Sequence, residues 1–180
     1  MVSFNLRFPL SEVTKWENVY WADCSADDKQ REQHLESVVG PSMRTHSCAS
    51  KQQLLEVTRW KSPRSQTYVS RNPDDFVTAV TQVALSTDNE RLRIEVLRLL
   101  SGVEWSMASV ILHFGFDNLY PILDVRALWS AGIDEVDRVV YDFDLWWAYS
   151  LSCRKLAQDA GVSMRKLDRA LWGYSKKATQ

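Results

Sequence analysis

Cysteine is scarce and scattered in this chain. Only Cys24, Cys48 and Cys153 occur among its 180 residues, and no CxxC pair is present. An odd number of widely spaced cysteines argues against a full disulfide framework. Three thiols also cannot provide the four thiolate ligands of an ordinary iron–sulfur cluster. We therefore expect reduced cysteines, no iron–sulfur cluster and a cytoplasmic protein.

Long hydrophobic runs are missing as well. No apolar stretch reaches the roughly 18 residues that a membrane-spanning helix needs. The N-terminal apolar stretch is interrupted by Arg7 and Pro9 and is soon followed by Glu12, a pattern unlike a secretory signal peptide. These absences predict a protein without a membrane partner.

The chain also lacks the basic excess that is typical of nucleic-acid-binding proteins. Its formal net charge is −1. The charge is unevenly distributed, however, because residues 151–180 hold seven Lys and Arg against two Asp, whereas residues 72–150 hold thirteen acids against five Arg. A folded molecule could therefore present one basic face, although solvated helix faces explain such runs equally simply.

Apolar residues recur at helical spacing through most of the chain. Their spacing by three and four predicts helices over residues 74–85, 90–100, 106–114, 125–132, 143–161 and 163–177. No alternating strand pattern persists in the second half, so we expect an all-α fold. Residues 22–53 are polar and contain Gly40-Pro41, which favours loop with short helices. We expect an irregular or helical segment over 1–53, packed on a compact helical domain over 54–180 as one structural unit.

A glycine turn separates two of the predicted helices. Leu100-Ser101-Gly102-Val103-Glu104 lies between them, and Gly102 suits a backbone conformation with positive φ. In a helix–hairpin–helix of this kind, backbone N–H groups at the start of the second helix face outward, where a phosphate can dock. Such turns are often purely structural. Here, however, Asp124 follows 22 residues after Gly102, at the start of the predicted helix 125–132.

This order of motifs resembles the helix-hairpin-helix DNA glycosylase superfamily of base-excision repair proteins. LLSGVEWSMASVILHF and YPILDVRALW carry the resemblance, which covers about residues 72–132. It implies binding of double-stranded DNA and hydrolysis of the N-glycosidic bond of a flipped, damaged or mispaired base. Asp124 would stabilise positive charge on the sugar and orient a water molecule. Asp124 also stands where an N-cap belongs, so a purely structural role is equally open.

Two residues depart from the family pattern. Family members that also cleave the backbone have a lysine for a Schiff base where this chain has Ser106, or its neighbour Trp105. Neither residue can form a Schiff base, so the resemblance implies a monofunctional enzyme. Glu104 replaces the second glycine of the hairpin, and its charge would repel a phosphate by about 1 kcal/mol or more. The resemblance further implies a monovalent cation on backbone carbonyls of the turn, for which Leu100, Gly102 and Val103 are the candidates.

Several residues are candidates for DNA contact. Within the turn they are Leu100, Ser101, Gly102, Val103 and Ser106. Trp60, Lys61 and Arg64 mix an aromatic ring with basic side chains and could line the approach to the site, although a helix end with a buried Trp is the simpler interpretation. Arg126 is either a phosphate contact or the partner of an ion pair.

Two other functions are open at this point. One is a glycosylase fold that has lost catalysis and serves as a module for binding DNA or a protein partner. The other is a transcription regulator, because residues 154–176 resemble a helix-turn-helix with Gly161 in the turn and Arg165, Lys166 and Arg169 on the second helix. The same residues can also form two packed helices. We expect a monomer, and the residues do not indicate which base would be removed.

Overall fold

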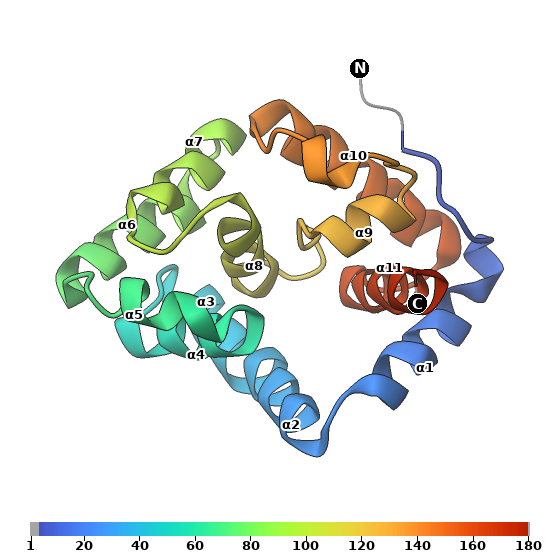
Figure 1. The fold of residues 1–180 in the computed structure, drawn as a ribbon. Coiled ribbons are helices and arrows are strands. Elements are labelled where there is room, and N and C mark those ends of the chain that lie inside the picture. Colours follow the sequence, from blue (N-terminus) through green and yellow to red (C-terminus); the bar gives the residue numbers. More distant parts are fainter. Residues whose placement is uncertain (1–3, 180) are drawn as a thin grey trace. The chain divides into compact units, whose positions relative to one another are not determined.

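The computed structural model describes residues 4–179, and these residues form helices and connecting turns without any strand. The chain divides into two units. The middle unit is Ala26–Asp117, and the terminal unit combines the chain up to Ser25 with the chain from Asn118 onward. Figure 1 shows the helices of both units. The all-α prediction is confirmed for the described residues, whereas the expected boundary at residue 53 lies inside the middle unit.

The middle unit is built around one buried helix. It comprises α2 (Ala26–His34), a π-helical segment (Leu35–Val39), α3 (Gly40–His46), α4 (Lys51–Lys61), α5 (Gln66–Val69), α6 (Asp74–Ser86), α7 (Glu90–Glu95), a 3-10 segment (Val96–Leu99) and α8 (Trp105–Gly115). Helix α8 contacts α3, α4, α6 and α7 (Figure 1). Ten of its eleven residues are buried, which agrees with its largely apolar sequence.

Residues 26–46 are more helical than the sequence analysis predicts. Leu35, Val39 and Met43 are buried and recur every four residues, so the segment has a core-facing stripe despite its polar composition. Gly40 lies inside this run because a side chain there would come within 2.9 Å of the Phe114 carbonyl oxygen. Pro41 is tolerated because it lies in the first turn of α3. The Gly-Pro pair therefore allows close helix packing instead of marking a loop.

The terminal unit packs its last helix between elements from both ends of the chain. Its main helices are α1 (Val13–Asp23), α9 (Val125–Ser130), α10 (Phe143–Ala160) and α11 (Met164–Ala178). Helix α11 contacts α1, α9 and α10. A side chain at Gly173 would come within 2.4 Å of the Trp16 carbonyl oxygen, so this glycine permits the close approach of α1 and α11.

The structure also bears on the lengths of the helices and on the state of the cysteines. No helix among residues 4–179 combines the length and the hydrophobicity that crossing a bilayer would require. Cys24, Cys48 and Cys153 are all free thiols, and Cys153 is buried.

Candidate nucleic-acid interface

The glycine turn of the middle unit adopts the conformation that its sequence predicts. Gly102 has φ +80°, and the Val103 N–H donates to the Leu100 carbonyl oxygen at 3.1 Å. A side chain at position 102 would also lie 2.9 Å from Tyr68 Cβ and 3.1 Å from the Val69 nitrogen. Backbone conformation and packing against α5 therefore both require glycine here.

A buried asparagine holds the turn in place. The Asn72 side chain accepts from the Ser101 N–H at 2.9 Å and donates to the Ser101 carbonyl oxygen at 3.0 Å. It also donates to the Val69 carbonyl oxygen at 2.9 Å, and only 4% of the residue is exposed. Three hydrogen bonds from one buried amide fix the hairpin relative to α5. The sequence does not reveal this clamp, because Asn72-Pro73 is also an ordinary start for the helix that follows.

Side chains of the turn divide between the core and the surface. Leu100 and Val103 are buried, so only their backbone could contact a ligand, whereas Ser101 is exposed. Gly102 and Ser106 are half-buried. Beside the turn, Tyr68 and Leu99 are 55% and 63% exposed. The Arg71 guanidinium lies 5.2 Å from the centre of the Tyr68 ring, so an aromatic face and a cation adjoin the hairpin.

Helix α8 begins without a side-chain cap. Among the described residues, no side chain accepts a hydrogen bond from its first turn. Helices α1, α3, α5 and α6 likewise begin without a side-chain cap, whereas α4, α7, α9, α10 and α11 are capped by Ser50, Asn89, Asp124, Asp142 and Ser163 respectively. The first N–H groups of a helix have no acceptor within it and carry partial positive charge. The start of α8 can therefore accept an external anion.

Glu104 is oriented toward a positive partner. Its carboxylate lies 3.2 Å from Nη2 of Arg98, and Nε of Arg98 donates to the same oxygen. The Arg98 guanidinium also lies 4.8 Å from the Trp105 ring centre. The pair is exposed, so its contribution to stability is small. It nevertheless offsets the negative charge beside the turn, which was the main obstacle to phosphate binding in the sequence.

The aromatic–basic segment at the end of α4 has a mixed placement. Trp60 is half-buried and meets Phe114 of α8 edge to face, with 5.5 Å between ring centres. This contact favours a packing role for the Trp60 ring over stacking on a base. Lys61 is half-buried and Arg64 is exposed, so Arg64 is the more available of the two for a phosphate.

Asp124 belongs to the terminal unit and has a clear structural role. Its Oδ1 accepts from the Arg126 N–H at 2.9 Å and thereby caps α9. The carboxylate is half-buried, and the Arg126 guanidinium lies 5.5 Å from the centre of the Trp172 ring. The capping bond engages Oδ1 of the two carboxylate oxygens. The predicted capping role is thus confirmed, and the predicted catalytic role stays a prediction.

Two tyrosines lie within electrostatic reach of Asp124. Burial raises the pKa of Tyr141 to about 12, with the charges of Asp124 and Asp137 adding to the effect. Burial also raises the pKa of Tyr149, which lies close to Cys153 and Asp168. The Tyr141 hydroxyl is buried and has no hydrogen-bond partner among the described residues. A neutral phenol therefore lies close to the Asp124 carboxylate.

The predicted cation site rests on backbone carbonyls alone. The Leu100 carbonyl already accepts from the Val103 N–H, which leaves it one lone pair for an ion. Among residues 4–179, no group of three or more His, Cys, Asp or Glu residues is suited to a metal ion. A monovalent cation at Leu100, Gly102 and Val103 stays a prediction.

The basic residues of the regulator alternative lie against α1. Arg169 and Lys166 pair with Glu17 at 3.3 Å and 3.4 Å, and Arg165 donates to the Tyr20 hydroxyl at 3.3 Å. Arg169 is 8% exposed. Gly161 adopts φ +63° and ends α10, as the turn pattern predicts. The candidate recognition helix thus uses its basic face for packing within the terminal unit, which gives the regulator alternative no support.

The comparisons with known proteins add no relative to this description. The chain matches no protein-family model, no curated protein and no solved structure. Any functional inference therefore depends on the residues and their arrangement.

Proposed function

We propose that this protein binds double-stranded DNA through the hairpin at residues 100–106 and acts as a monofunctional DNA glycosylase. One observation carries the proposal: the start of α8 has no side-chain cap, at a glycine turn that the buried Asn72 amide holds in place. An asparagine clamp and a left-handed glycine fix the turn without occupying the N–H groups beyond it.

Binding would depend chiefly on the phosphate backbone. A fixed turn with outward N–H groups contacts phosphates without reading sequence. Arg71 and Tyr68 extend this surface with a cation and an exposed ring, and Arg98 reduces the repulsion from Glu104. Because the chain carries a net charge of −1, affinity would be modest. Because the contacts are to phosphates, affinity would fall as the salt concentration rises.

Chemistry would depend on Asp124. N-glycosidic cleavage places positive charge on the sugar, and a nearby carboxylate stabilises that charge and orients the attacking water. The α9 cap fixes the orientation of the Asp124 side chain. Ser106 cannot form a Schiff base with the resulting abasic site, so cleavage of the DNA backbone is not expected.

A second candidate is a DNA-binding module without catalysis. The hydrogen bond between Asp124 and the α9 backbone favours it, because that bond alone would explain an aspartate at this position. The two candidates share the hairpin and differ only in the role of Asp124.

Fluorescence anisotropy with two short duplexes distinguishes them. One duplex is intact, and the other carries a cationic abasic-sugar mimic of the transition state, which requires no knowledge of the substrate base. A glycosylase should bind the mimic at least about tenfold tighter, a difference of about 1.4 kcal/mol. Asp124→Asn should abolish this preference while retaining the cap, since Asn and Asp cap helices about equally. Asp142→Asn, the same change at the cap of α10, should leave the preference intact.

The remaining outcomes are equally informative. Equal binding of both duplexes would support the module and overturn catalysis. Ser101→Glu should abolish duplex binding, whereas Gln82→Glu, which makes the same charge change at an exposed position of α6, should not. Absence of binding to either duplex at low salt would overturn both candidates.

A further inference from the structure

A polar cleft lies between α2 and α4 of the middle unit, apart from the hairpin turn in the sequence. Its volume is about 470 Å³, which is within the range of small-molecule sites. Asp27, Arg31 and His34 line it from α2, and Gln52, Glu56 and Arg59 line it from α4. Each set recurs at intervals of three or four residues, so one face of each helix turns long polar side chains toward the cleft.

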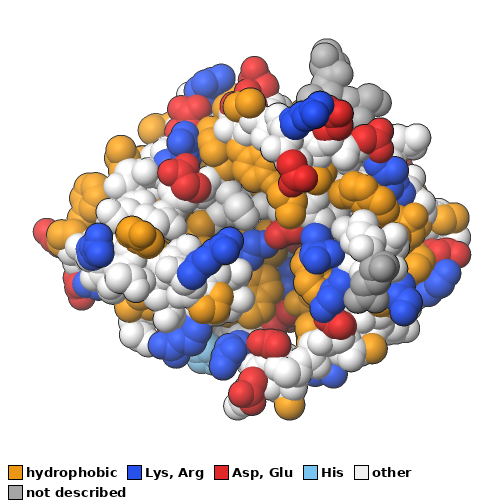
Figure 2. Space-filling model, in the orientation of Figure 1, with side chains coloured by type: hydrophobic (Ala, Val, Ile, Leu, Met, Phe, Trp, Pro, Cys, Tyr) orange, Lys and Arg blue, Asp and Glu red, His pale blue; other side chains and the backbone are white. Residues whose placement is uncertain are grey.

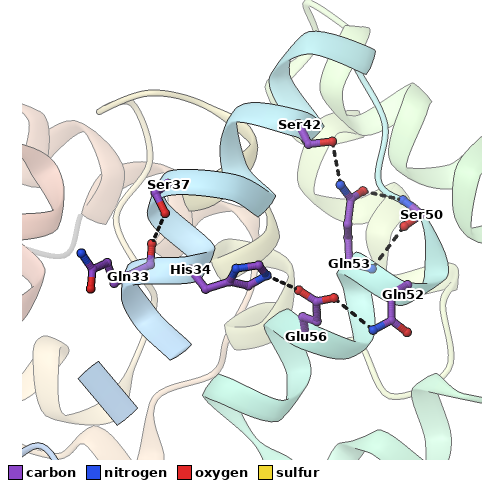
Figure 3. A network of polar contacts seen from close by, with 8 residues as sticks. All are labelled: Gln33, His34, Ser37, Ser42, Ser50, Gln52, Gln53 and Glu56. Carbon is purple, nitrogen blue, oxygen red and sulfur yellow. Dashed lines mark hydrogen bonds and ion pairs between the residues drawn. The ribbon is translucent and has the colours of Figure 1, made fainter. Parts of the chain in front are cut away.

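Both oxygens of the Glu56 carboxylate already contact other side chains within this cleft. Figure 3 shows its two oxygens directed to different partners, with His34 Nε2 at 2.9 Å from Oε2 and Gln52 Nε2 donating to Oε1 at 3.0 Å. Glu56 is half-buried, and the two contacts hold it in one orientation. Both of its oxygens therefore face partners from the protein itself.

The two arginines of the cleft make fewer hydrogen bonds and ion pairs than Glu56 does. Arg59 is exposed and makes no ion pair or side-chain hydrogen bond among the described residues. Arg31 pairs only with Asp28 on its own helix, at 3.5 Å, and both side chains are about half exposed. Figure 2 shows a histidine flanked by basic side chains over α4. Guanidinium groups without a strong partner are the usual ligands for phosphate, which they bind in a bidentate fashion.

We propose that the α2–α4 cleft binds a phosphate group, clamped between Arg31 and Arg59. The Gln52 amide and the His34 ring hold the Glu56 carboxylate within the same cleft. Asp27 lies one turn before Arg31 and makes no ion pair or side-chain hydrogen bond within residues 4–179, so a ligand that also offers a hydrogen-bond donor fits better than a bare anion. The phosphate could belong to a small phosphomonoester or to the DNA backbone, and this inference does not rest on the glycosylase proposal.

Calorimetric titration of the full chain tests the clamp. The probes are thymidine monophosphate, inorganic phosphate and, as a control without phosphate, thymidine. We expect thymidine monophosphate to bind with a millimolar or tighter Kd, and thymidine to give no signal. The double variant Arg31→Gln, Arg59→Gln should weaken binding at least about tenfold. Arg91→Gln, which removes an exposed arginine paired with Glu95 on α7, is the matched control and should leave binding unchanged.

A second variant predicts a gain. Glu56→Gln removes the negative charge from the lining and should tighten phosphate binding severalfold, because like charge then no longer opposes the ligand. Equal weakening by Arg91→Gln, or binding of thymidine as tight as that of its monophosphate, would overturn the proposal.

The source of the phosphate is decided by a parallel titration with intact duplex. If duplex binding falls in the double arginine variant and the small phosphates give no signal, the clamp serves the DNA backbone. If the small phosphomonoester alone depends on the arginines, the ligand is a small molecule. If neither probe depends on them, the clamp does not exist. Because Ser101→Glu disables the hairpin and leaves the cleft intact, failure of the DNA proposal is distinguishable from failure of this one.

Discussion

The helices α8 and α9 are each preceded by an acidic residue, but only the one before α9 caps its helix. Each helix leaves its first N–H groups without acceptors within the helix. At α9, the Asp124 side chain supplies one, whereas at α8 the preceding residue is Glu104, whose carboxylate turns to Arg98 instead. The polar side chain nearest each turn is thus used for capping in one case and for charge neutralisation in the other.

The two turns are therefore held in place by different groups. The Asn72 amide holds the α8 turn, and Glu104 does not cap the helix. The α9 turn is held by its own carboxylate, which accepts from the Arg126 N–H. Substitutions at the two turns should therefore have different costs, and four comparisons test this.

The largest effect is expected at Gly102. Gly102→Ala places a side chain in the left-handed region and within about 3 Å of Tyr68 and Val69, so it should destabilise the fold by about 3 kcal/mol. Gly161→Ala is the matched control, because Gly161 also has positive φ but no atom lies within 4 Å of its added Cβ. It should cost about 1 kcal/mol. Urea unfolding measures both, and equal costs would show that packing against α5 is unimportant.

A smaller effect is expected at the clamp. Asn72→Ala removes three hydrogen bonds from a buried amide and should lower the free energy of unfolding by about 2 kcal/mol. Asn89→Ala removes the single capping bond of α7 and should cost about 1 kcal/mol or less. Only the first variant should also weaken duplex binding in the anisotropy assay. A loss of duplex binding in Asn89→Ala would show that the clamp is not specific to the turn.

The sequence predicts local features of these turns well and long-range ones poorly. Helical spacing located α8 and α9, and the identities of Gly102 and Asp124 predicted positive φ and a cap. The Asn72 clamp joins residues 29 positions apart, and no periodicity or local motif encodes such a contact. The Arg98–Glu104 pair was missed because its residues flank the turn and only the folded hairpin brings them together.

The contrast between local and long-range features also explains where the boundaries of the two units lie. A boundary near residue 53 was expected because residues 22–53 are polar, yet the buried stripe of Leu35, Val39 and Met43 makes this segment part of the middle unit. Three apolar residues among many polar ones form a weak signal in a sequence window. In the folded unit they are decisive, because burial depends on which face they share.

At Asp124 the comparison predicts a moderate cost that depends on the replacement. Asp124→Ala removes the α9 cap and should destabilise the fold by about 1 kcal/mol, whereas Asp124→Asn should cost only a few tenths. Thermal unfolding of both variants beside the parent protein measures the difference. Equal destabilisation by Ala and Asn would mean that the charge of Asp124, and not its capping oxygen, stabilises the turn.

The smallest effect concerns pH and the phenol near Asp124. Burial, followed by the charges of Asp124 and Asp137, raises the pKa of Tyr141 to about 12 from 10. The folded state therefore favours the neutral phenol, and the corresponding stability is fully present below pH 10 and is lost as the pH rises from 10 to 12. Because the ring is only partly buried, the loss should be about 1 kcal/mol at most. The Tyr141→Phe variant cannot ionise at this position, so the difference in unfolding free energy between it and the parent protein should shift in favour of the variant between pH 10 and pH 12. Asp124→Asn should reduce that shift without abolishing it, because burial is the larger cause. A difference that stays constant across this pH range would show that Tyr141 ionises as freely in the folded protein as in the unfolded chain.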